Sequence, residues 1–201
     1  GRWRVAAVLV CSGSLLLQLL LAWVPPPDVH LQESQVISGH LLMELVAIIV
    51  AALIAAVSWH TMEAQPGQSV AWLIAAFPVV AVCDLMHALT YAGMPELIGP
   101  NGTSRAIFFW LMGRSVEALA LGVVALGWVL PLRTRGAALA LAAAVSVLLV
   151  VWGSVGLHLF PATFEAGQGL TGFKVGYEFT LLLANAGEFS LVILELAASK
   201  A

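Results

Sequence analysis

The sequence predicts an all-α integral-membrane protein, a bundle of about six transmembrane helices. Of its 201 residues, 61% are hydrophobic and only 9% are charged, and the mean hydropathy is +1.00. A soluble globular chain usually has about 25% charged residues. The formal net charge is -3 and no stretch is rich in lysine or arginine, which argues against nucleic acid as a partner. Membrane lipids are therefore the expected surroundings of most of the chain.

Six apolar segments have lengths close to the ~20 residues that cross a bilayer. They cover approximately residues 3–24, 37–60, 69–92, 105–130, 136–159 and 172–198. The first segment follows two arginines, like the core of a signal peptide, but it is long and runs into Pro25 instead of a small-residue cleavage site. We therefore expect a retained helix. The connections are short and rich in Gly, Pro, Asn and Ser, so residues 1–201 are expected to form a single transmembrane domain.

The distribution of basic residues predicts the orientation of these helices. Cytoplasmic loops carry an excess of Lys and Arg. If the N-terminus is cytoplasmic, only Arg105 and Lys174 lie at the outer side, whereas five basic residues lie inside: Arg2, Arg4, Arg133, Arg135 and Lys200. This bias favours an N-in, C-in topology. The last segment ends in ELAASKA without a Gly or Pro stop, so we expect it to continue into a cytoplasmic output module.

Polar residues in the second and third segments lie at matching depths. His40 and Glu44 are four residues apart and Asp84 and His87 are three apart, and both spacings keep a pair on one helix face. At 1.5 Å per residue, the two histidines lie roughly 5 Å and the two carboxylates roughly 10 Å below the outer boundary. The four side chains are therefore expected to face one another across two antiparallel helices.

Further ionisable residues lie toward the outer half of the other segments. Arg114 and Glu117 belong to the fourth segment, His158 ends the fifth, and Lys174 and Glu178 begin the sixth. A charged residue at a helix centre costs on the order of 2.5–3.5 kcal/mol on insertion scales, so these groups should converge inside the bundle. One interpretation is a structural network in which Arg114 neutralises a carboxylate. The other is a ligand or metal site that opens outward.

The predicted metal ligands are a mixed set of nitrogen and oxygen donors. Imidazole with carboxylate suits zinc, iron or copper. Two facing histidines could equally hold a b-type haem, and a site without any ligand is a third alternative. The proposed metal set is His40, Glu44, Asp84, His87 and His158.

Three blocks of the sequence resemble the membrane-associated sensor domain of the MASE3 type. They are DLMHALTYAGM at 84–94, RAIFFWLMGRSVEALAL at 105–121 and FPATFEAGQGLTGFKVGYE at 160–178. Where the family pattern has a proline between Thr171 and Phe173, this chain has Gly172. The matching positions are Asp84, His87, Tyr91, Arg114, Glu117, Gly167, Gln168, Gly169, Leu170, Thr171, Phe173, Lys174 and Glu178.

The resemblance implies a multi-pass input domain in the inner membrane of a bacterium, placed before a histidine kinase, PAS or diguanylate cyclase module. We expect ligand-binding residues at Tyr91, Trp110, Arg114, Glu117, Lys174 and Glu178 and no catalysis within this chain. The expected partners are lipids and the output module. Whether the domain forms a homodimer stays an open question. The glycine-rich stretch before Phe173 is expected to be either a lid over the pocket or a turn capped by Thr171.

Two other functions stay open. The first is an intramembrane metal-dependent hydrolase, in which His40, His87 and His158 hold the metal and Glu44 or Asp84 is the base. The second is a small transporter, although no repeated pair of Gly- or Pro-broken helices is visible.

The predicted topology places both termini in the cytoplasm. A phosphatase that is active only outside should therefore be silent when fused to the C-terminus, whereas a fluorescent protein that folds in the cytoplasm should be bright there. The reverse pattern of reporter activity would contradict the topology and the depths derived from it.

Overall fold

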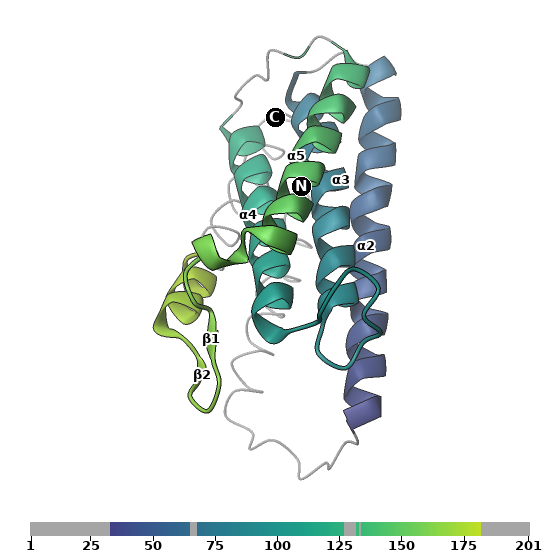
Figure 1. Cartoon of the computed structure of the whole chain (residues 1–201). Coiled ribbons are helices and arrows are strands. Elements are labelled where there is room, and N and C mark those ends of the chain that lie inside the picture. The colour runs from purple at the N-terminus through teal and green to yellow at the C-terminus, as the bar shows by residue number, and fades with distance from the viewer. Residues whose placement is uncertain (1–32, 65–67, 127–131, 133, 182–201) are drawn as a thin grey trace, which may run out of the picture.

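The computed structural model describes residues 33–64, 68–126, 132 and 134–181. Four long helices lie side by side in this part of the chain (Figure 1). They are α2 (Glu33–Ala64), α3 (Gln68–Thr90), α4 (Thr103–Ala125) and α5 (Arg135–Val155). Each is long and apolar enough to cross a membrane, so the second to fifth predicted segments are confirmed as candidate membrane spans.

Two of the predicted segments are not covered in full. The segment predicted at 3–24 lies outside the described residues, and the segment predicted at 172–198 is described only at its start, where 172–181 are helical. The helix count of six and the N-in, C-in orientation therefore stay predictions.

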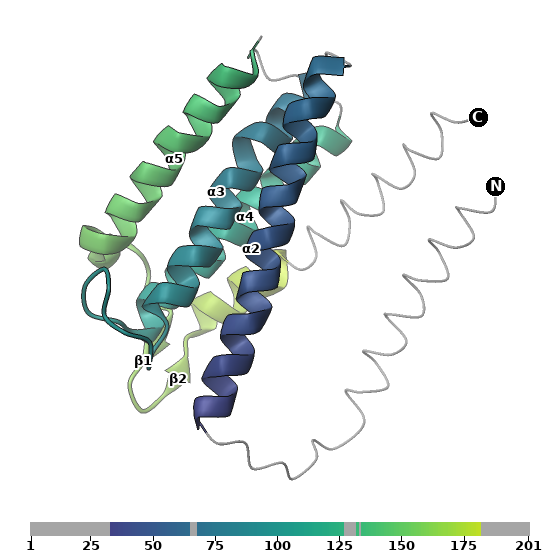
Figure 2. The same ribbon diagram turned by 90° about the vertical axis from the view of Figure 1, so that its right-hand side faces the viewer.

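Helix α3 is the central helix of the described bundle. It packs against α2, α4 and α5, and Figure 2 shows it between α2 and α5. Of the residues in the most apolar stretch of α3, 61% are buried inside the protein, compared with 11% for the same kind of stretch in α2. Small side chains such as Ala71 and Ala75 let its neighbours approach closely, as is usual in membrane bundles. The outer faces of α2 and α5 expose Leu, Val and Ile, which suits contact with lipid.

The helix ends differ from the predicted boundaries by a few residues. The 32-residue helix α2 begins at Glu33, four residues before the apolar run, because backbone hydrogen bonding continues through polar residues. Helix α4 was predicted to reach residue 130 but ends at Ala125. Helix α5 was predicted to reach residue 159 but ends at Val155, and Gly156 starts a 3-10 turn, η1 (Leu157–Leu159). Apolar patterning therefore located the spans but not their ends.

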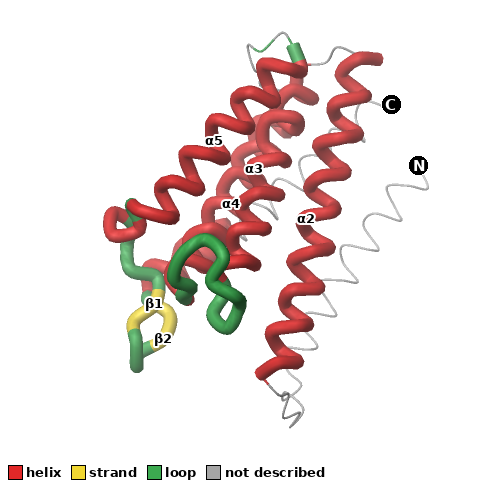
Figure 3. The backbone as a smooth tube through the Cα atoms, turned by 45° about the vertical axis from the view of Figure 1, so that its right-hand side comes forward, coloured by secondary structure: helices red, strands yellow, loops and turns green. Residues whose placement is uncertain are grey.

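A small hairpin after η1 was not predicted. Strand β1 (Phe164–Glu165) pairs antiparallel with β2 (Gly169–Leu170). The turn contains Gly167 at φ +84°, a left-handed conformation that glycine adopts without steric cost. The hairpin and the loop between α3 and α4 lie at the same end of the bundle (Figure 3).

Thr171 links the hairpin to the helical segment 172–181. Its Oγ1 accepts a hydrogen bond from the backbone N–H of Lys174 at 3.3 Å. This is the contact of an N-cap residue. The predicted cap at Thr171 is therefore confirmed.

An aromatic cluster joins α4 and α5 close to the hairpin. The Phe108 ring contacts Trp152 and Phe160 edge to face, with centroids 5.3 and 5.0 Å apart. Gly153 on α5 faces this cluster, and a Cβ there would lie 2.4 Å from Cζ of Phe109 and 2.9 Å from Cε1 of Phe108. The absence of a side chain at Gly153 therefore allows α5 to approach the two buried rings.

Replacing Gly153 with alanine should destabilise the bundle. The added methyl overpacks the site, which typically costs about 1–3 kcal/mol and outweighs the helix-propensity gain of at most about 1 kcal/mol. We expect a lower midpoint of thermal unfolding in detergent. Gly136→Ala is the matched control on α5, because its Cβ would meet no atom within 4 Å in the described part of the chain. Equal midpoints for the two variants would contradict this account of the contact.

Candidate functional site

A buried ion network joins α3 to α4. The Asp84 side chain is 1% exposed, and Nη2 of Arg114 donates to its two carboxylate oxygens at 2.8 and 2.7 Å. Nη1 of Arg114 donates to Oε2 of Glu117, one turn further along α4, at 2.5 Å. One guanidinium therefore serves two carboxylates inside a membrane span, where an unpaired charge is costly.

Gly113 makes the short distance between the two helices possible. A Cβ at this position would lie 3.1 Å from Cβ of Cys83 and 3.3 Å from Oδ1 of Asp84. A larger residue would push α4 away from the carboxylate. The network therefore depends on a small residue directly before Arg114.

His87 lies one turn beyond Asp84 on α3 and contacts two other helices. Its Nδ1 is 2.7 Å from the backbone oxygen of Ala106 on α4. Its Nε2 faces Oε1 of Glu44 on α2 at 3.7 Å. His87 is 6% exposed, so its imidazole is largely buried between the helices.

His40 and Tyr91 complete this cluster of side chains. The His40 ring contacts His87 edge to face, with centroids 5.2 Å apart, and lies against Tyr91 at 4.4 Å. One ligand atom from each of His40, Glu44 and His87 lies within 4.8 Å of the other two. The structure therefore brings together three of the four residues that were expected to face one another across α2 and α3, and Asp84 is the exception.

His87 also lines a small cavity. Its volume is about 180 Å³, and it is lined by His87, Ile107, Trp110, Lys174 and Glu178. Lys174 forms an ion pair with Glu178, and its Nζ lies 5.6 Å from the centroid of the Trp110 ring. The cavity is smaller than the roughly 300–1,000 Å³ typical of drug-sized ligands, so it suits a small polar molecule or water.

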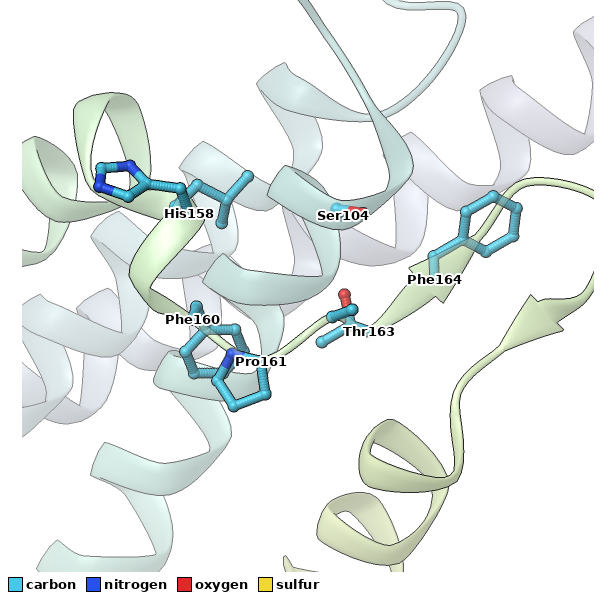
Figure 4. A pocket seen from close by; sticks show the side chains of 8 residues that line it. Ser104, His158, Phe160, Pro161, Thr163 and Phe164 are labelled. Carbon is cyan, nitrogen blue, oxygen red and sulfur yellow. The ribbon is translucent and has the colours of Figure 1, made fainter.

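Two of the predicted metal ligands lie apart from this cluster. Asp84 is bound to Arg114. His158 was expected to complete the metal set, but it is exposed on η1 because α5 ends before it at Gly156. It lines a second pocket of about 470 Å³, whose other walls include Ser104, Thr163 and Phe164. Figure 4 shows His158 and Phe164 at opposite ends of that pocket.

Some contacts of the site were not foreseen. The hydroxyl groups of Ser115 and Tyr177 are 2.7 Å apart and join α4 to the segment 172–181. Tyr177 lies three residues after Lys174, so helical spacing could have placed both on the face toward α4. The backbone oxygen of Ala106 had no sequence signal, because every residue carries a carbonyl.

The family model MASE3, described as a membrane-associated sensor domain, matches residues 31–199. The match covers most of the chain, including every residue of the two side-chain clusters and the cavity. The chain matches no curated protein and no solved structure.

Arg114→Leu should be more destabilising than Asp84→Asn. Loss of the arginine leaves the fully buried Asp84 carboxylate without a counter-charge, which costs roughly 3–5 kcal/mol. Loss of the aspartate charge leaves Arg114 with Glu117, and the arginine side chain is 24% exposed. Thermal unfolding in detergent measures both effects, and the double variant should recover part of the Arg114→Leu loss. If Asp84→Asn lowers the unfolding midpoint more than Arg114→Leu, or if the double variant recovers none of the loss, the Asp84–Arg114 pair does not make this contribution to stability.

Proposed function

Because the chain belongs to the MASE3 family of membrane-associated sensor domains, we propose that it is the sensory input domain of a bacterial signalling protein in the inner membrane. The output would be a histidine kinase or diguanylate cyclase module that follows the last helix. The cavity between His87 and Lys174 is proposed as the place where the stimulus acts.

The main support for this proposal is that residues of three elements line the cavity. His87 comes from α3, Ile107 and Trp110 come from α4, and Lys174 and Glu178 come from the segment 172–181. A molecule in the cavity would therefore contact both the central helix and the start of the helix that we expect to lead to the output module. A binding event can shift an equilibrium only through such differential contacts.

The charges at the cavity indicate what kind of molecule would act there. Lys174 is shared between Glu178 and the face of the Trp110 ring. A small polar or anionic molecule would compete with Glu178 for the ammonium group. Such competition would weaken the Lys174–Glu178 ion pair at the cavity and would change how the segment lies on α4.

Separate contacts hold the segment 172–181 to the bundle and would resist that movement. Tyr177 is hydrogen-bonded to Ser115. Phe173 contacts Phe160 edge to face at 5.8 Å, and the Phe160 ring lies against Phe108 of α4. The segment therefore has a defined docked position, and a second position would require the loss of a small number of identifiable contacts.

The geometry does not favour the alternative of a metal-dependent hydrolase. That mechanism was predicted to use His40, His87 and His158 as metal ligands and Glu44 or Asp84 as the base. His158 lies on η1 outside the histidine cluster and Asp84 is held by Arg114, so only two of the three histidines and Glu44 remain together. We therefore propose sensing, and no described contact specifically favours transport.

Tyr177→Phe tests the coupling. It keeps the ring but removes the hydrogen bond to Ser115, which is worth about 0.5–1.5 kcal/mol and would shift a two-state equilibrium by about 2- to 10-fold. We expect the basal output of the full-length protein in membrane vesicles, measured as kinase or cyclase activity, to change by that factor.

Thr180→Val is the matched control for the coupling test. It also removes one hydroxyl from the same segment, but among the described residues the Thr180 hydroxyl bonds within its own helix, to the carbonyl of Gly176. Its output should equal that of the unmodified protein. If Tyr177→Phe also leaves the output unchanged while both proteins insert normally, the segment does not transmit the signal.

A further inference from the structure

The hydrogen bond of His87 determines which of its nitrogens is free. The Ala106 carbonyl, 2.7 Å from Nδ1, can only accept, so Nδ1 carries the hydrogen. In the neutral imidazole, Nε2 then presents a lone pair. Histidines that bind metals characteristically donate their other N–H to a carbonyl or carboxylate in this way.

The lone pair of His87 faces a second electron-rich atom. Oε1 of Glu44 lies 3.7 Å from Nε2, beyond the usual hydrogen-bond range of about 2.7–3.2 Å. Two such atoms repel each other unless a positive charge lies between them. Nitrogen and oxygen ligands of one tetrahedral ion, each about 2.0 Å from it, lie roughly 3.3 Å apart. The observed separation therefore needs only a small contraction to hold an ion.

His40 supplies a third donor on the same side. It lies one turn before Glu44 on α2, so the two side chains share a helix face. Its Nε2 is buried and makes no hydrogen bond to any described residue. A buried, unpaired nitrogen is costly, and coordination of an ion would remove that cost. Ligand atoms of His40, Glu44 and His87 already lie within 4.8 Å of one another.

The charges around the cluster also favour a divalent cation. Asp84 and Glu117 share the single positive charge of Arg114, which leaves one excess negative charge. An ionised Glu44 adds a second. Lys174 and Glu178 neutralise each other. A doubly charged ion beside Glu44 would therefore balance the charges of these six residues, in surroundings where the low dielectric makes imbalance costly.

We propose that His40, Glu44 and His87 bind one divalent first-row transition-metal ion, with zinc and ferrous iron as the chemistries that best match two imidazoles and one carboxylate. Three protein ligands leave at least one coordination position open. The geometry favours an ion over a haem, because the two imidazoles contact each other edge to face and Glu44 lies within reach of both. The site deepens the proposed sensory function, since His87 also lines the cavity.

The test is metal binding to the full chain, purified in detergent and stripped with a chelator. Zinc and, without oxygen, ferrous iron are added, and elemental mass spectrometry gives the metal content. Cobalt(II) serves as a spectroscopic probe of the ligand set. We expect one ion per chain. Glu44→Gln keeps the size of the side chain and should weaken binding by more than the roughly 10- to 100-fold that changes outside the ligand shell cause.

Two histidine variants are matched controls. His60 is exposed near the opposite end of α2, and His158 is exposed on η1, so His60→Ala and His158→Ala should retain one ion per chain. His40→Ala and His87→Ala should lose it, with helix content by circular dichroism confirming that each variant is folded. If His87→Ala does not fold, Glu44→Gln and His40→Ala decide the question.

Several outcomes would overturn the proposal. They are less than one ion bound per chain, equal loss of metal in His60→Ala, or a haem absorption band that disappears in His40→Ala. This proposal and the sensory function can fail independently. Metal content is measured on the purified chain, whereas the sensory function is tested by kinase or cyclase activity. A bound ion with output insensitive to Tyr177→Phe would contradict only the sensory coupling.

Discussion

The charge balance around Arg114 is the constraint on which the rest of the described structure depends. A carboxylate as buried as Asp84 is tolerated in a membrane span only beside a counter-charge. That requirement fixes how far α4 is shifted along α3, and Gly113 lets the helices come close enough to meet it. With this alignment set, the backbone of Ala106 reaches His87, and Trp110 lies at the cavity. The ion pair therefore neutralises the buried carboxylate and joins α3 to α4 where Gly113 lets them lie close together.

His87 connects the otherwise separate parts of the site. One nitrogen is bound to the backbone of α4, and the other faces α2. The same residue lines the cavity that Lys174 and Glu178 also line. A change in the charge or coordination of this imidazole would therefore alter its contacts with α2, with α4 and with the cavity that the segment 172–181 also lines.

The spans and much of the site could be predicted from the sequence, because ionisable residues are rare within apolar spans and are expected to face the bundle interior. Helical spacing and depth placed His40, Glu44 and His87 together correctly. The same reasoning failed for His158, since a depth count assumes a continuous helix and α5 stops at Gly156. The hairpin was missed because strands of two residues carry no alternating pattern. Contacts made by backbone atoms, such as the Ala106 carbonyl, have no residue signature at all.

The length of α2 has a consequence for the environment of the protein. A helix of 32 residues spans about 48 Å, whereas the hydrocarbon core of a bilayer is about 30 Å thick. Such a helix accommodates the difference by tilting or by extending into the headgroups. Helix α2 carries two of the three clustered donor residues, and α3 carries the third. Hydrophobic mismatch therefore bears on the site, because a change in the tilt of α2 would change the angle at which His40 and Glu44 approach His87.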